Sequence, residues 1–154
     1  MPTISENTAH KVVTCVDALQ DQLVAWRRDF HRFPELGFLE YRTTAKIIEE
    51  LRNCGYEVLT GEDATDPSAR MGLPTQQEDE AAIARAIDEG ANPDIVHAIA
   101  GGFTGAVAIL KNGDGPVVGM RFDIDCLPLT EKTEHGSAHE GSMHACGHDS
   151  HITM

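Results

Sequence analysis

The residues best suited to chemistry are concentrated in one short segment, residues 143–151. This segment contains one thiol, three imidazoles and one carboxylate, which belong to Cys146, His144, His148, His151 and Asp149. Thiolate and neutral imidazole are ligands that zinc prefers, and imidazole also binds manganese, nickel and cobalt. The residue types therefore predict a divalent-metal site but do not select the metal.

The spacing of Cys146 and His148 constrains the local backbone. Two side chains that are two residues apart point to the same side only where the chain is extended or looped, because on a helix they diverge. Gly147 between them lets the backbone approach a metal closely. We therefore expect a loop that carries both residues, followed by a helix that starts near Asp149. Asp149 would be a carboxylate at the helix N-terminus or a partner of a ligating histidine.

A second pair of candidate residues, Asp123 and Asp125, precedes this segment. In an extended strand both carboxylates would project from the same face, where two unpaired charges are costly unless a cation or a proton lies between them. A metal or a protonated imidazole would remove that cost. Both aspartates could equally cap the loop that begins at Leu127 and Pro128, because aspartate is common where strands end.

The elements that position these residues begin with a predicted long helix. Apolar residues recur every three or four positions from Val12 to Phe30, which is typical of a stripe that faces a core. A second helix, over about residues 44–51, should end near Gly55, and residues 56–59 should form a strand.

The stretch from about residue 65 to residue 100 is acidic and rich in alanine. Thr75 and Glu78 have the spacing of a capping box that opens a helix, and Asn92 precedes a second, shorter helix. Since Ile83 and Ile87 alone give this stretch only a narrow apolar face, it is either a helical insertion or a solvated partner surface, and we expect a solvated face.

Residues 103–110 and 116–122 are two apolar runs joined by turn-forming residues 112–115, a pattern that predicts a β-hairpin with Asp123 at the end of its second strand. Helices, strands and a polar site at strand ends together predict an α/β layer fold whose site lies outside the edge of the sheet.

Composition excludes several classes of partner. The chain has 154 residues, 41% of them hydrophobic, which suits one soluble domain. Its 12 basic and 25 acidic residues give a net charge of -13, so nucleic acid and anionic membranes are poor candidate partners. There is no secretory signal in residues 1–8, no run of the ~20 apolar residues that span a bilayer, and no paired cysteine motif. We expect a cytoplasmic protein with reduced thiols.

Residues 120–128 (Met-Arg-Phe-Asp-Ile-Asp-Cys-Leu-Pro) and 143–151 (Met-His-Ala-Cys-Gly-His-Asp-Ser-His) resemble the amidohydrolase branch of the M20 metallopeptidase family. Residues 26–31 and 34–38 are similar to the opening helix and turn of that branch. Residues 68–74 and 101–105 resemble, within the branch, the members that cleave p-aminobenzoyl-glutamate. Cys126 and Ser150 stand where the branch usually has alanine and glycine, and neither change removes a ligand.

The resemblance implies a two-metal hydrolase that uses manganese or zinc. Cys146 and His148 would be metal ligands, and Asp125 would be a catalytic residue that orients or polarises the site. The other residues near this site would be Asp123, His144, Asp149 and His151. The general-base glutamate and the remaining ligands would lie outside residues 1–154.

The resemblance also implies an α/β fold, in which residues 1–154 are the N-terminal portion of a three-layer zinc-peptidase-like catalytic domain, with the helical insertion at about 65–100. The lid or dimerisation domain and the C-terminal part would be absent, so we expect the chain alone to be inactive. The full-length protein would pair with a homologous subunit, in a homodimer or a heterodimer. Its substrate, a small N-acyl amino acid, would be p-aminobenzoyl-glutamate, cleaved to p-aminobenzoate and glutamate.

Two alternatives to this function stay open. The enzyme could act on other N-acyl amino acids, such as hippurate or auxin conjugates. The chain could also be a non-catalytic module that binds metal or pairs subunits and uses its acidic stretch as a docking surface.

Overall fold

The computed structural model of the protein describes residues 5–134 and 136–154. Residues 1–4, which belong to the segment where the sequence predicts no secretory signal, lie outside the described residues. Among the described residues, none of the helices combines the length and the apolar character that a membrane span requires.

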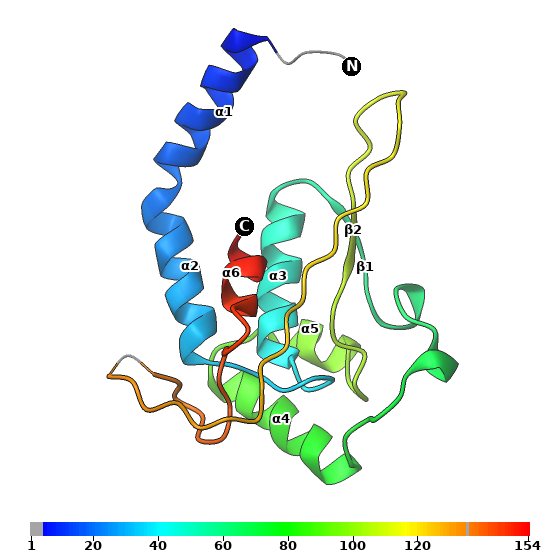
Figure 1. Ribbon diagram of the computed structural model, residues 1–154. Helices are drawn as coiled ribbons and strands as arrows, with labels where there is room; N and C mark the ends of the chain where they lie inside the picture. The colour runs from blue at the N-terminus through cyan, green and yellow to red at the C-terminus, as the bar shows by residue number, and fades with distance from the viewer. Residues whose placement is uncertain (1–4, 135) are drawn as a thin grey trace.

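Helices dominate the fold, and two short strands form its sheet (Figure 1). The helices are α1 (Glu6–Ala18), α2 (Gln20–Arg32), α3 (Tyr41–Asn53), α4 (Gln76–Asp88), α5 (Pro93–Ala98) and α6 (His148–Thr153). Single turns of 3-10 helix lie at Gly61–Asp63 and Pro67–Ala69. Strands β1 (Glu57–Leu59) and β2 (Val107–Ile109) pair in antiparallel orientation. The predicted mixture of helix and sheet is confirmed.

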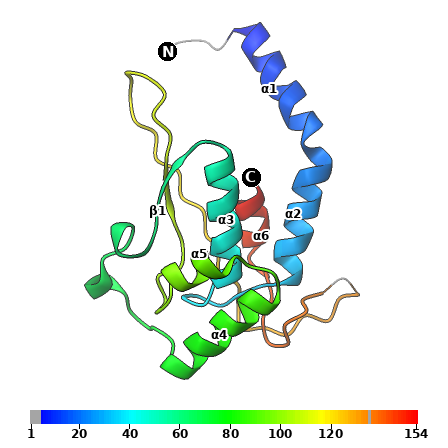
Figure 2. The same ribbon diagram turned by 180° about the vertical axis from the view of Figure 1, so that it is seen from behind.

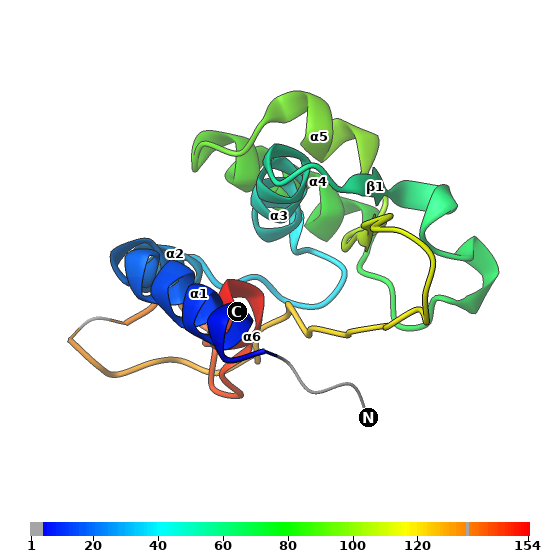
Figure 3. The same ribbon diagram turned by 90° about the horizontal axis from the view of Figure 1, so that it is seen from above.

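The helices form two groups. Figure 3 shows α1, α2 and α6 on one side of the molecule and α3, α4 and α5 on the other. Helix α6 packs against α2 and lies beside it in all three views (Figures 1, 2 and 3). The C-terminal segment that carries the candidate ligands therefore lies beside a helix from the first third of the chain.

The hydrophobic core is built by α3, α4 and α5. Its buried residues are Tyr41, Ala45, Ile48, Ala82, Ala86, Ala91, Ile95, Val96 and Ile99. The expectation of a solvated face between residues 65 and 100 is therefore wrong for the sides of α4 and α5 that join this core, while the other side of α4 is exposed at Ala84. That expectation considered only Ile83 and Ile87 as apolar contacts of this stretch. Ala82 and Ala86 also belong to the core, because their small side chains let α4 pack closely against its neighbours.

Local signals located three helix ends correctly, the starts of α4 and α5 and the end of α3. The capping box is present, since Thr75 and Glu78 hydrogen bond to each other's backbone N–H groups, and Asn92 caps α5 by accepting from the backbone of Asp94. Helix α3 ends just before Gly55, which has the left-handed φ of +83°. These predictions succeeded because each depends on residues only a few positions apart.

The predicted long first helix is interrupted at Leu19, and the prediction that its stripe faces a core is wrong for α1. No residue of α1 is buried, and the side chains of Val12 and Val16 are 57% and 53% exposed. Of α2, only Phe30 is buried. The periodicity correctly predicted a helix, but no described element packs over the first half of its apolar stripe.

The predicted hairpin between residues 103–110 and 116–122 is also wrong. The partner of β2 is β1, with Val58 opposite Ala108. Residues 116–122 form no strand, and Val117 is 97% exposed. A strand needs a neighbouring strand edge for its backbone hydrogen bonds. Residues 116–122 have no such edge beside them among the described residues. Asp123 and Asp125 consequently lie in irregular chain rather than at a strand end.

Candidate metal centre

Helix α6 places two of the predicted imidazoles next to each other. It starts at His148, one residue earlier than expected, after Gly147 adopts a left-handed φ of +79°. His151 follows one turn later, so the two rings stack with their centroids 5.6 Å apart and their planes 11° from parallel. Both imidazoles therefore lie on one face of α6.

Asp125 fixes the orientation of one of these rings. The Nδ1 atom of His148 lies 2.8 Å from the backbone carbonyl oxygen of Asp125 and 3.1 Å from its carboxylate Oδ1. A carbonyl oxygen can only accept, so Nδ1 is the donor and the lone pair of the neutral ring is on Nε2. This arrangement is typical of a metal-ligating histidine held by a carboxylate.

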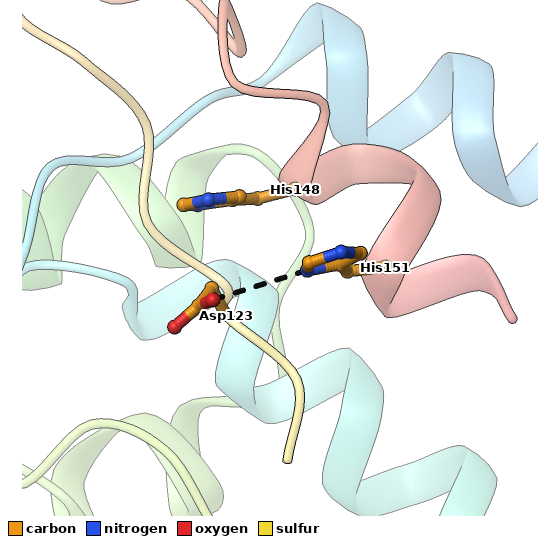
Figure 4. Close-up of side chains that lie close together, drawn as sticks. All are labelled: Asp123, His148 and His151. Carbon is orange, nitrogen blue, oxygen red and sulfur yellow. Dashed lines mark ion pairs between the residues drawn. The ribbon is translucent and has the colours of Figure 1, made fainter.

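Asp123 completes a three-residue cluster with His148 and His151 (Figure 4). One potential ligand atom from each residue lies within 4.8 Å of the others. Asp123 Oδ2 is 4.0 Å from His151 Nδ1, and its other oxygen pairs with Arg121 at 2.5 Å. Asp123 therefore faces Arg121 and His151, whereas Asp125, which was predicted to share a face with it, contacts His148.

The cluster suits a divalent cation. Two imidazoles and one carboxylate form a donor set used for zinc and also compatible with manganese. The Nδ1 atom of His151 is buried and has no hydrogen-bond partner among the described residues. A buried polar atom without a partner is costly, and a bound cation would satisfy it.

Cys146, the other predicted ligand, lies outside this cluster. Its thiol is free and the residue is exposed, two positions before His148. Its role as a ligand stays a prediction.

His144 and Asp149, predicted to lie near the site, are both buried. Neither ring nitrogen of His144 has a hydrogen-bond partner among the described residues. Its burial, opposed by the nearby charge of Asp149, lowers the pKa of His144 to about 4. A buried, neutral imidazole without a hydrogen-bond partner is unusual. Among the described residues next to α6, no polar group pairs with the ring of His144.

Spacing did not reveal the partners of Asp149. The carboxylate Oδ2 of Asp149 lies 2.9 Å from His31 Nδ1 and 3.1 Å from Arg27 Nε, both on α2. The other nitrogen of His31 faces Glu131. Residues 26–31 were singled out only through the family resemblance, because nothing in their local spacing indicates a contact with α6.

Known proteins resemble this chain over most of its length, although no protein-family model matches it. The chain is 41% identical over 146 residues to an indole-3-acetyl-aspartic acid hydrolase of Enterobacter agglomerans, a match that covers 88% of this chain and 34% of the relative. It is 40% identical over 149 residues to one of the subunits of p-aminobenzoyl-glutamate hydrolase from Escherichia coli, covering 90% of this chain and 34% of the relative.

Solved structures agree with these relatives. An aminobenzoyl-glutamate utilization protein from Klebsiella pneumoniae superimposes with a TM-score of 0.75 at 36% identity, over 85% of this chain and 32% of its own. A dinuclear metal binding peptidase from the M20 family of Bacillus subtilis superimposes with a TM-score of 0.56 at 33% identity, over 89% of this chain and 29% of its own. The chain is thus similar to proteins of the M20 peptidase family, and it spans about a third of the length of the proteins that it matches.

Proposed function

We propose that this chain is part of a metal-dependent amidohydrolase that cleaves p-aminobenzoyl-glutamate to p-aminobenzoate and glutamate. The observation that carries the proposal is the cluster of Asp123, His148 and His151, with the Nδ1 of His148 held by Asp125. The names of two relatives support the substrate class. Both indole-3-acetyl-aspartic acid and p-aminobenzoyl-glutamate are N-acyl derivatives of an acidic amino acid.

The proposed mechanism assigns a role to each residue of the site. When bound there, a divalent ion supplies Lewis-acid activation of an amide carbonyl and of water. Asp125 keeps the proton on Nδ1 of His148, so that Nε2 can bind the cation. Asp123 and His151 offer a carboxylate and a second imidazole to the same position. We propose Cys146 as a further ligand and two ions, manganese or zinc, in the complete site.

The remaining parts of the enzyme follow from the same proposal. Residues 1–154 would form the N-terminal portion of the catalytic domain, and the general-base glutamate, the other ligands and the lid domain would come from outside them. A homologous subunit would pair with the protein, consistent with the name of the Escherichia coli relative, which describes one subunit of a hydrolase.

The test is an assay of the complete reading frame for glutamate release from p-aminobenzoyl-glutamate in the presence of Mn²⁺ or Zn²⁺. His148→Ala should abolish release, whereas Asp114→Ala, which changes an exposed turn residue, should leave it unchanged. Parallel assays with hippurate and indole-3-acetyl-aspartate identify the acyl group. Hydrolysis of only those compounds would overturn the substrate, and no hydrolysis together with metal binding would favour the non-catalytic module.

A further inference from the structure

The contact between α2 and α6 is organised around one buried carboxylate. Asp149 is completely buried and lies between the two imidazole residues of α6, His148 and His151. Its Oδ2 atom meets His31 at 2.9 Å and Arg27 at 3.1 Å, and its Oδ1 accepts the backbone N–H of Ser150 at 3.0 Å. A buried carboxylate is tolerated only where such partners surround it, so these contacts determine where Asp149 lies.

His31 is itself held from two sides. Its Nδ1 faces Asp149, and its Nε2 lies 3.2 Å from Oε1 of Glu131. Glu131 is fixed in turn, because its Oε1 accepts from the hydroxyl of Thr133 at 2.6 Å and its Oε2 from the backbone N–H of Ser137 at 2.8 Å. The imidazole of His31 is therefore locked in one orientation by carboxylates from two separate segments.

Helix α6 depends on this support. It has only six residues, and isolated helices of that length are unstable in water. Asp149 anchors its first turn, and the carbonyl oxygen of the same residue accepts the hydroxyl of Thr153 at 2.7 Å, which ties the second turn to the first. The positions of both imidazoles of α6 thus follow from the position of Asp149.

We propose that His31 is a positioning residue for the metal centre. Through Asp149 it holds α6 so that His148 and His151 face Asp123, without itself touching the cluster. The proposal rests on the proposed function only in requiring that this cluster binds a divalent cation. Removing a group that orients a metal ligand typically weakens metal affinity 10- to 100-fold, so we expect an effect of about 10-fold or more.

Two conservative variants separate the contacts of His31. In His31→Asn the side-chain amide can replace the Nδ1 donor to Asp149, whereas in His31→Gln it can replace only the Nε2 contact with Glu131. Co²⁺ is the probe, because its visible absorption reports coordination geometry, and affinity is measured by titration of the full chain. We expect His31→Asn to keep most of the affinity, and His31→Gln and His31→Ala to lose about 10-fold.

His139 provides a matched control for loss of stability alone. It resembles His31 in that both ring nitrogens have acceptors, Pro34 O at 2.8 Å and Glu89 Oε1 at 2.6 Å, but it does not lie on α2 or α6. His139→Gln should lower the unfolding temperature and leave Co²⁺ affinity unchanged.

The outcomes are distinct. Weaker Co²⁺ binding in His31→Gln, rescued in His31→Asn and absent in His139→Gln, supports the positioning role. Equal affinity in all four variants, with only stability reduced, overturns it while the metal site stands. If the unsubstituted chain shows no Co²⁺ spectrum at all, the metal site of the proposed function fails, and the positioning role fails with it.

Discussion

The Nδ1 proton of His148 is donated to Asp125, whose backbone oxygen lies 2.8 Å away and whose carboxylate lies 3.1 Å away. Two acceptors from one residue thus define one tautomer of one imidazole. The carboxylate adds to the basicity of the ring, while the backbone oxygen alone would preserve its orientation. The two contributions can therefore be separated by substitution.

Asp125→Ala should weaken metal binding about 10-fold without unfolding the chain. The backbone contact to His148 survives the substitution, so the ring keeps its tautomer but loses the charge that strengthens it as a ligand. Isothermal titration with Mn²⁺ or Zn²⁺ measures the change, and Asp114→Ala serves as the control. An affinity equal to that of the unsubstituted chain would refute a role for the Asp125 carboxylate in metal binding.

Thiol labelling should separate Cys126 from the other cysteines. Burial raises the pKa of the Cys126 thiol to about 11, so at pH 8 it is almost entirely protonated and shielded from reagent. Cys15, Cys54 and Cys146 are exposed. Mass spectrometry after brief alkylation should find three modified thiols in the folded chain and four after denaturation.

The same reaction tests the predicted ligand. If Cys146 binds metal, added Zn²⁺ should slow its alkylation and leave the rates of Cys15 and Cys54 unchanged. Cys146→Ser identifies the protected peptide. Equal rates with and without Zn²⁺, at concentrations that saturate the Asp123, His148 and His151 cluster, would exclude Cys146 as a ligand.

Glu40→Gln should stabilise the protein at high pH. Burial raises the pKa of Glu40 to about 7, although Thr104 Oγ1 donates to it at 2.5 Å. Since the folded state holds this proton more tightly than the unfolded state, the unsubstituted chain loses stability as pH rises from about 4.5 through 7. The variant has no such loss, so its advantage in unfolding free energy should grow from near zero at pH 4 to about 3 kcal/mol at pH 8.

Denaturant unfolding at several pH values measures this difference. Comparing the two proteins at each pH is necessary because His144, with its pKa lowered to about 4, acts in the opposite direction. Its protonation favours unfolding as pH falls below about 6.5. The His144 contribution cancels in the comparison, and a pH-independent difference would contradict the assignment to Glu40.

Ala86→Leu should destabilise the fold by about 1 to 3 kcal/mol. Ala86 is completely buried in the contact between α4 and the rest of the core, so extra methylene groups have no room. Ala84→Leu is the matched control on the exposed side of the same helix. Thermal unfolding of both variants measures the difference, and equal stability would show that the alanine side of α4 is not tightly packed.

The sequence by itself determined those features that depend on near neighbours. The capping residues Thr75 and Asn92 and the helix end at Gly55 were all predictable, because each hydrogen bond or dihedral preference involves residues a few positions apart. The segment that holds His148 and His151 was visible for the same reason, since several imidazoles lie close together along the chain, whereas the assignment of Cys146 and His148 as ligands stays a prediction.

Only the tertiary structure decided which distant groups meet. It paired β2 with β1 instead of with residues 116–122, and it buried the alanines of α4 while α1 stayed exposed. It also brought His31 to Asp149 across 118 positions of sequence. Strand pairing and buried ion contacts depend on the competition among all available edges and partners, and local periodicity contains no information about which of these lies nearby.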